Sequence, residues 1–212
     1  MNTGIIFDLD GTLWEVIDAT HSAVNEVATK NGFEPISRKT ICDVFGTPRD
    51  VCAKIYFPTL SVEEACKLMD ESTIININNL QKSGGNVFNH VKETIEELSK
   101  KYKLFIVSNT AFNSYIEAFI NCSGTNAYFT DYIATGEYNL TKSEAIKKIV
   151  VDHNLDKSIY VGDTEKDMEA ALGAGVEFIQ AKYGFGKDLK TAYSIDKIEE
   201  LPKKISVFDH LV

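Results

Sequence analysis

The sequence has little positive charge, few cysteines and no apolar run long enough to span a membrane. Lys and Arg number 22 against 31 Asp and Glu, and the net charge of -9 argues against a general nucleic-acid binder, which normally carries a basic patch. No Cys-x-x-Cys pair occurs among the 4 cysteines, so we expect reduced thiols rather than a disulfide framework. The first residues, Met-Asn-Thr-Gly, enter a predicted strand without the basic and apolar regions of a signal peptide. These absences predict a cytoplasmic protein that binds neither nucleic acid nor a membrane.

The rest of the sequence divides into a helical stretch and a stretch in which strands and helices alternate. Its 212 residues, 44% of them hydrophobic, suffice for one sizeable core and a small second module. Apolar residues recur at helical spacing up to residue 84, and beyond it apolar strands alternate with amphipathic helices. Such alternation is typical of a parallel sheet in an α/β protein. We predict a core domain (residues 1–14 and 85–212) with an inserted helical domain (residues 15–84).

Two carboxylates follow the first predicted strand at a spacing that suits a metal ion. The apolar run Ile5–Phe7 has the pattern of a strand covered on both faces, and Asp8 and Asp10 follow it. Ligands of parallel sheets bind beyond the carboxyl ends of strands, where residues two apart point the same way. Two carboxylates in one small volume repel each other unless a cation such as Mg²⁺ lies between them, and Thr12 after the glycine turn can bind an anion. The alternative is an ordinary Asp-Gly turn.

Two further polar groups lie at the ends of predicted elements. Ser108 ends an apolar strand, and the hydroxyl of Ser108 or Thr110 could either bind a ligand or cap the following helix. Lys142 lies in the first turn of a helix that Thr141 and Glu144 open with a capping box, where a cation faces the positive end of the helix dipole. A bound phosphate would remove that conflict, and a solvated surface lysine is the alternative.

Another acidic pair follows the predicted strand at residues 159–161. Asp163 comes directly after Gly162 at the end of this strand, and Asp167 comes four residues later. Thr164 and Asp167 could form a helix-capping pair, which would account for Asp167 but not for Asp163. Asp163 is therefore predicted to bind a ligand at the same edge of the sheet as Asp8.

These features resemble the four motifs of the haloacid dehalogenase superfamily of phosphotransferases. The resemblance follows the motif order over nearly the whole chain: Asp-x-Asp-Gly-Thr at residues 8–12, Ser108, Lys142, and Gly-Asp-x-x-x-Asp at residues 162–167. It implies a Rossmann-like three-layer core with a parallel sheet and an all-helical cap inserted after the first motif. Phosphoglycolate phosphatase and β-phosphoglucomutase belong to the subfamily that it points to.

The resemblance also implies a role for each motif residue. Asp8 would be the nucleophile, and Asp10 would be the general acid and base. The phosphate-binding residues would be Thr12, Ser108, Asn109 and Lys142. The cofactor would be Mg²⁺, and its ligands would be Asp8, the backbone carbonyl of Asp10, Asp163 and Asp167, the last as a ligand or as an outer partner.

The predicted function is therefore Mg²⁺-dependent hydrolysis of a small phosphomonoester through an aspartyl-phosphate intermediate. An aspartate at position 10 distinguishes the chain from similar dehalogenases and P-type ATPases, which generally lack it. One alternative is a phosphomutase of the β-phosphoglucomutase type, and another is a non-catalytic module that binds a phosphate ligand or a protein.

Two residues of the predicted cap are candidate substrate contacts. Thr47 as N-cap and Pro48 as first residue predict a helix that places Arg49 in its first turn, where it could meet a second anionic group. His21 lies near the expected hinge of the cap. For both residues the alternative is a side chain without a part in binding.

Overall fold

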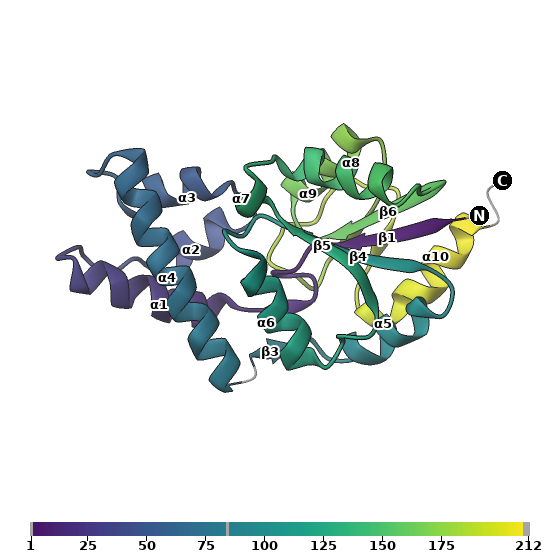
Figure 1. Cartoon of the computed structure of the whole chain (residues 1–212), viewed down its shortest axis with the longest axis horizontal. Coiled ribbons are helices and arrows are strands. Elements are labelled where there is room, and N and C mark those ends of the chain that lie inside the picture. Colours follow the sequence, from purple (N-terminus) through teal and green to yellow (C-terminus); the bar gives the residue numbers. More distant parts are fainter. Residues whose placement is uncertain (1, 84, 210–212) are drawn as a thin grey trace.

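Strand β1 (Thr3–Phe7) lies at the centre of a parallel sheet (Figure 1). The computed structural model describes residues 2–83 and 85–209, and these residues form a six-stranded sheet in the order β5-β4-β1-β6-β7-β8, parallel at every step. The other strands are β4 (Lys103–Ser108), β5 (Phe129–Ala134), β6 (Lys157–Gly162), β7 (Glu177–Ala181) and β8 (Ser194–Ile195). Residues 1, 84 and 210–212, which the predicted domains include, lie outside the described residues.

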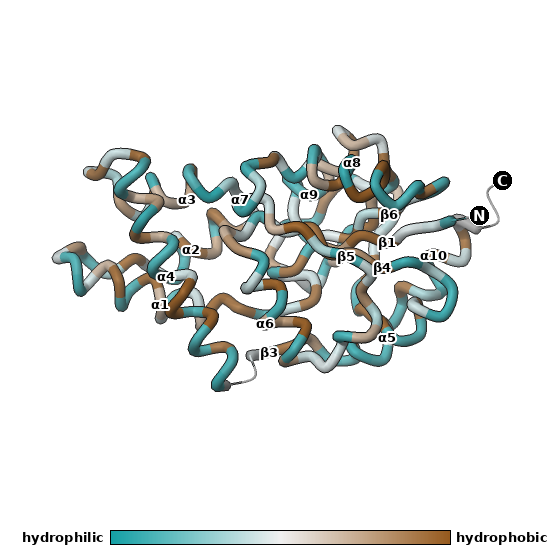
Figure 2. The backbone as a smooth tube through the Cα atoms, viewed as in Figure 1, coloured by the Kyte–Doolittle hydropathy of each residue, from teal (hydrophilic) through white to brown (hydrophobic). Residues whose placement is uncertain are grey.

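Helices cover both faces of the sheet, because alternate residues of β1 point to opposite sides. Ile5 and Phe7 enter one apolar core with side chains of α5, α6 and α10, whereas Ile6 enters a second core with side chains of α8 and α9. Figure 2 shows the apolar residues concentrated along these central strands. The helices of this part are α5 (Val91–Ser99), α6 (Asn113–Ser123), α7 (Thr135–Tyr138), α8 (Lys142–Asp152), α9 (Glu165–Ala174), the 3₁₀ turn η1 (Ile198–Glu200) and α10 (Leu201–Asp209).

A group of helices with a core of its own lies beside the carboxyl ends of the strands (Figure 1). Its members are α1 (Ile17–Lys30), α2 (Arg38–Val44), α3 (Arg49–Tyr56) and α4 (Val62–Ser83). Val24, Ile41, Ala53 and Phe57 are among the buried side chains that hold α1, α2 and α3 against α4. We call these four helices and the loops between them the helical block.

The two chain segments that enter and leave the helical block lie side by side. Strand β2 (Trp14–Glu15) pairs with β3 (Asn86–Val87) in an antiparallel ribbon. Trp14 is fully buried and packs its ring against the rings of Tyr115 and Phe119. The helical block is therefore joined to the sheet through one short ribbon, in which the ring of Trp14 is buried.

The predicted α/β class with a parallel sheet is confirmed, and two local details differ. Thr47 is not the N-cap of α3, because Pro48 occupies that position without a side-chain cap and the Thr47 hydroxyl donates to the carbonyl of Val44. The elements that were not predicted are α2, α7, α10, η1 and the two-residue strands β2, β3 and β8. Both β8 and its pairing with β7 are only two residues long, too short for a recognisable apolar pattern.

None of the helices in the described part of the chain has the length and apolar character needed to cross a membrane. The cysteines Cys42, Cys52, Cys66 and Cys122 are free thiols.

Candidate active site

Lys142 joins two carboxylates at the carboxyl edge of the sheet. Asp8 directly follows β1, and Asp167 lies in the first turn of α9. The Lys142 ammonium donates to Asp8 Oδ1 at 2.9 Å and to Asp167 Oδ1 at 2.6 Å, and it lies over the ring of Tyr160. All three charged side chains are at most 6% exposed, so the alternative of a solvated surface lysine is wrong.

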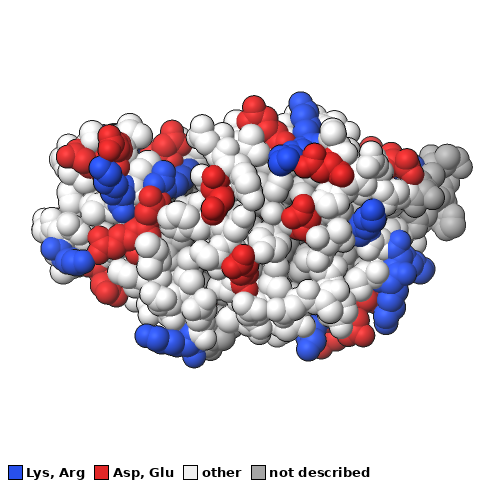
Figure 3. Space-filling model, viewed as in Figure 1, with Lys and Arg blue, Asp and Glu red and all other residues white. Residues whose placement is uncertain are grey.

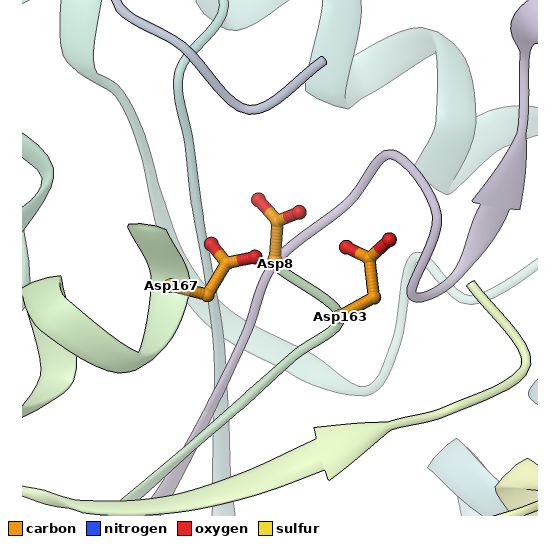
Figure 4. Close-up of side chains that lie close together, drawn as sticks. All are labelled: Asp8, Asp163 and Asp167. Atoms are coloured by element: carbon orange, nitrogen blue, oxygen red, sulfur yellow. The ribbon is translucent and has the colours of Figure 1, made fainter. Parts of the chain in front are cut away.

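Asp163 brings a third buried carboxylate to the same place. It directly follows β6, and its Oδ2 accepts hydrogen bonds from the backbone N–H groups of Phe185 (2.6 Å) and Gly186 (3.1 Å). Its Oδ1 is buried and has no hydrogen-bond partner. Figure 4 shows the carboxyl groups of Asp8, Asp163 and Asp167 gathered around one space. One oxygen from each of them lies within 4.8 Å of the others.

This group of carboxylates suits a hard divalent cation. Mg²⁺ takes oxygen ligands and commonly binds through one or two carboxylates, water and a substrate phosphate. The unpaired Asp163 Oδ1 is an acceptor that a cation would satisfy, and Lys142 offsets only one of three negative charges. Asp167 already accepts from Lys142 and, through Oδ2, from Thr164 in the predicted capping box. Asp8 and Asp163 therefore have the more available oxygens.

Burial raises the pKa values of these acids. The pKa of Asp8 rises to about 7 because the carboxyl group is desolvated, although Lys142 opposes this change. Desolvation also raises the pKa of Asp163 well above its usual range, with Asp167 and Asp8 adding to the rise. Burial alone would lower the pKa of Lys142, but Asp167 and Asp8 raise it well above its usual value. The lysine is therefore charged, and a cation beside the acids would favour their ionised forms.

Asp10 lies apart from this acidic group and faces a different partner. Its Oδ1 accepts a hydrogen bond of 3.0 Å from the hydroxyl of Tyr115 in α6. Burial and the charge of Asp8 raise the pKa of Asp10 to about 7, and the bond from Tyr115 lowers it. The carboxyl group thus has one oxygen held by Tyr115 and one oxygen free to exchange a proton with a ligand.

The loop after Asp8 turns tightly and leaves a buried hydroxyl unused. The Leu9 carbonyl accepts from the backbone N–H groups of Leu13 and Trp14, and Gly11 has a φ of +86°. A Cβ at Gly11 would lie 2.5 Å from Asp163 Oδ2, so only glycine passes this close to the acidic group. The Thr12 hydroxyl is buried without a hydrogen-bond partner, which leaves it available to an anion.

Ser108 and Asn109 lie at the end of β4, next to β1. Helix α6 begins at Asn113 with Phe112 as its N-cap and no side-chain cap, so the alternative that Ser108 or Thr110 caps this helix is wrong. Ser108 is 3% exposed. Asn109 donates to the carbonyl of Gly46 in the helical block at 3.0 Å, which makes it a contact between the block and the sheet.

A cavity of about 100 Å³ lies between the helical block and the sheet, with Asp10 in its wall. Arg49 also lines it, in the first turn of α3 as predicted. Its guanidinium group is held by Asp70 through two hydrogen bonds and donates to the Cys66 carbonyl at 3.1 Å. His21 lies in α1 and is half-buried, but it is not among the residues that line the cavity.

Comparison with known proteins decides the family. Residues 5–181 match the family described as haloacid dehalogenase-like hydrolase. The chain belongs to this family. It is 24% identical over 219 residues to a phosphoglycolate phosphatase of Vibrio parahaemolyticus, with 96% of each chain covered.

Solved structures of the haloacid dehalogenase-like hydrolases share the fold of the whole chain. A haloacid dehalogenase-like hydrolase of Streptococcus pneumoniae has a TM-score of 0.82 at 22% identity and covers 98% of both chains. A predicted phosphatase of Clostridium acetobutylicum has a TM-score of 0.83 at 20% identity and covers 98% of this chain and 99% of its own. The predicted family, the predicted fold and the predicted enzyme class, a phosphatase hydrolase, are confirmed.

Some residues around the site of this haloacid dehalogenase-like hydrolase were not predicted from the sequence. Tyr115 lies at an ordinary apolar position of a helix, and nothing local indicates that its hydroxyl reaches Asp10. The loop of Phe185 and Gly186 could have been suspected, because a Gly-Phe-Gly sequence follows soon after β7. Such a sequence favours close approach of the backbone to another group.

Proposed function

We propose that this protein is a Mg²⁺-dependent phosphomonoester hydrolase that works through an aspartyl-phosphate intermediate. The observation that carries the proposal is that the two acids lie in different surroundings. Asp8 lies in the buried acidic group with Lys142, whereas Asp10 lines the adjacent cavity. The phosphoryl group would lie over Asp8, and its leaving group would extend past Asp10 into the cavity.

In the first step, Asp8 attacks the phosphorus atom and forms an acyl phosphate while Asp10 gives a proton to the departing alcohol. In the second step, Asp10 takes a proton from the water molecule that hydrolyses the acyl phosphate. Lys142 holds Asp8 Oδ1, which supports attack by the other oxygen of Asp8. Tyr115 holds Asp10 Oδ1, which supports proton transfer by Asp10 Oδ2.

Catalysis of phosphoryl transfer depends largely on stabilising charge on the transferring group. We assign this role to Lys142 and to the hydroxyl groups of Thr12 and Ser108, with Asn109 beside them. A Mg²⁺ ion held by Asp8, Asp163, the carbonyl of Asp10 and, directly or as an outer partner, Asp167 would supply further positive charge at the same place.

We further propose that residues 15–84 form a cap on a core domain of residues 1–14 and 85–212. The Asn109–Gly46 hydrogen bond and the cavity between the two parts support this reading. The substrate would be a small metabolite, since the cavity is small. Lys and Arg are interspersed with Asp and Glu on the face in Figure 3, which agrees with a small-molecule substrate rather than nucleic acid. Free cysteines support a cytoplasmic location.

The deciding experiment measures phosphate release from a panel of phosphomonoesters, with Mg²⁺ or with EDTA, for the wild type and for Asp8→Asn. Phosphoglycolate belongs in the panel because of the names of the relatives. We expect release that needs Mg²⁺ and a fall in kcat of at least about 10³-fold in Asp8→Asn, since the nucleophile is lost. The exposed Asp18→Asn is the matched control.

Substantial turnover by Asp8→Asn would refute the nucleophile. Slow release together with isomerisation that depends on a bisphosphate would instead indicate the mutase. No release from any ester would favour the non-catalytic alternative.

A further inference from the structure

A buried amide in the cavity wall has an unused carbonyl oxygen. Asn76 of α4 lines the cavity and is 5% exposed. Its Nδ2 donates to the Thr20 hydroxyl at 3.1 Å, while its Oδ1 is buried and has no hydrogen-bond partner. A buried acceptor without a partner destabilises the folded state, so such an atom in a binding cavity indicates a ligand that donates to it.

The hydrogen bond between Asn76 and Thr20 determines which atom of the amide has no partner. Tyr115 uses its only hydrogen to donate to Asp10 Oδ1. Thr20 lines the same cavity as this tyrosine. The Thr20 oxygen accepts from the Asn76 amide nitrogen. The carbonyl oxygen of Asn76 is consequently the atom left for a ligand.

The charges of the cavity favour an uncharged ligand group. Among the described residues that line the cavity, Arg49 is the cation and Asp10 is the anion. Asp70 engages two nitrogen atoms of the Arg49 guanidinium group, and its charge offsets that of Arg49. A carboxylate in the cavity would therefore meet no uncompensated cation, and it would place a second acceptor beside the Asn76 oxygen.

The hydroxyl groups of the same helix are already used. Ser72 donates to the Met69 carbonyl at 2.7 Å, and Thr73 donates to the same carbonyl at 2.9 Å. Among the described residues of α4 that line the cavity, Asn76 thus carries the buried polar atom without a hydrogen-bond partner, its Oδ1.

We propose that the leaving group of the substrate carries a hydroxyl group that donates to Asn76 Oδ1, so that the enzyme prefers phosphate esters of small polyols to those of hydroxy acids. This inference rests on the proposed phosphatase function and specifies its substrate class. It differs from what the names of the phosphoglycolate phosphatase relatives suggest, because phosphoglycolate ends in a carboxylate.

A matched series of esters tests the proposal. The series contains 2-hydroxyethyl and 3-hydroxypropyl phosphate, ethyl and propyl phosphate of the same lengths, phosphoglycolate and phosphoethanolamine, with p-nitrophenyl phosphate as a general reporter. We expect kcat/KM for at least one hydroxyalkyl ester to exceed that of its alkyl counterpart by about tenfold or more. A bound alkyl ester has no hydroxyl group and would leave Asn76 Oδ1 without a hydrogen-bond donor. Phosphoglycolate should be a poorer substrate than the hydroxyalkyl ester.

The variant Asn76→Leu replaces the amide by an apolar group of similar size. It should reduce the ratio of kcat/KM between the hydroxyalkyl and the alkyl ester to about one. Asn78→Leu, an exposed asparagine of the same helix, should keep the ratio of the wild type. If Asn76→Leu does not fold, the order of kcat/KM values that the wild type shows for the esters still tests the preference for a hydroxyl group.

The outcomes separate the two proposals. Preference of the wild type for phosphoglycolate, for phosphoethanolamine or for the plain alkyl esters would overturn the hydroxyl assignment while leaving the phosphatase function intact. Absence of release from every ester, p-nitrophenyl phosphate included, would overturn the proposed function itself.

Discussion

Tyr115 determines which oxygen of Asp10 can act on a ligand. Its hydroxyl donates to Oδ1, so in the proposed mechanism the proton that leaves with the alcohol would come from Oδ2. The tyrosine itself lies in an apolar core beside Trp14, and it is 3% exposed. A buried aromatic ring therefore fixes the orientation of an acid that lies directly before the glycine of a tight turn.

We expect Tyr115→Phe to impair proton donation while leaving the fold intact, since only one oxygen atom is removed. The kcat for alkyl phosphates should fall about tenfold, because general acid catalysis depends on the position of the acid. The kcat for p-nitrophenyl phosphate should fall much less, since its leaving group departs as a stable anion. The control is Tyr138→Phe, which alters an exposed tyrosine. Equal losses on both esters would contradict a positioning role for Tyr115.

The loop between α2 and α3 is the element that brings the helical block to the sheet. The Gly46 carbonyl accepts from Asn109, and the ring of Phe45 packs against that of Phe185 at 5.2 Å. Gly46 has a φ of +75°, and a Cβ there would lie 3.2 Å from the Thr164 hydroxyl. The loop therefore depends on glycine both for its conformation and for its contact with the core.

Gly46→Ala should weaken closure of the helical block over the site. The left-handed conformation costs about 1–2 kcal/mol for a residue with a Cβ, and the methyl group also presses on Thr164. We expect KM for alkyl phosphates to rise about three- to tenfold. Gly32→Ala is the matched control, because Gly32 has a φ of +77° with nothing near its Cβ. A KM that rises equally in both variants would show that backbone strain alone is responsible.

The position of each residue within its helix or strand determines whether the sequence could predict its place in this site. Asp8, Lys142 and Asp163 could be located because each lies at a strand end or in a capped first turn, features that local sequence specifies. Tyr115 and Asn76 could not be located in this way. Their helices have ordinary amphipathic patterns, and only the packing of α4, α1 and α6 against one another brings these polar groups to the cavity.

At the scale of the whole molecule, the sheet gathers acids from distant parts of the chain. Asp8 and Asp163 are 155 positions apart in the numbering, yet they adjoin because β1 pairs with β6. Folding therefore confines like charges in a buried space, and Lys142 offsets only part of the repulsion. Stability of the whole chain should respond to any cation that binds there.

Mg²⁺ should raise the melting temperature of the wild type. A ligand at about 100 times its Kd stabilises the folded state by roughly 2.7 kcal/mol, which corresponds to a shift of about 5–10 °C for a chain of this size. Asp163→Asn should melt higher than the wild type in EDTA, since burial disfavours the ionised carboxyl group that the asparagine replaces, and should show a smaller shift with Mg²⁺. Thermal melts with and without EDTA measure both effects.

The exposed Asp152→Asn provides the comparison for these melts. A shift with Mg²⁺ that is the same in Asp163→Asn and in the wild type would place the binding site elsewhere.

The position of Trp14 has a consequence for spectroscopy. It is the single tryptophan of the chain, and it lies in the ribbon that connects the helical block to the sheet. Its ring is fully buried against Tyr115 at 5.3 Å and Phe119 at 5.6 Å. Any movement of the helical block about this ribbon would alter the surroundings of the indole and hence its emission. The unlabelled protein therefore carries its single tryptophan at the proposed hinge, and a stopped-flow experiment with a phosphate analogue would follow the proposed movement of the helical block through tryptophan emission.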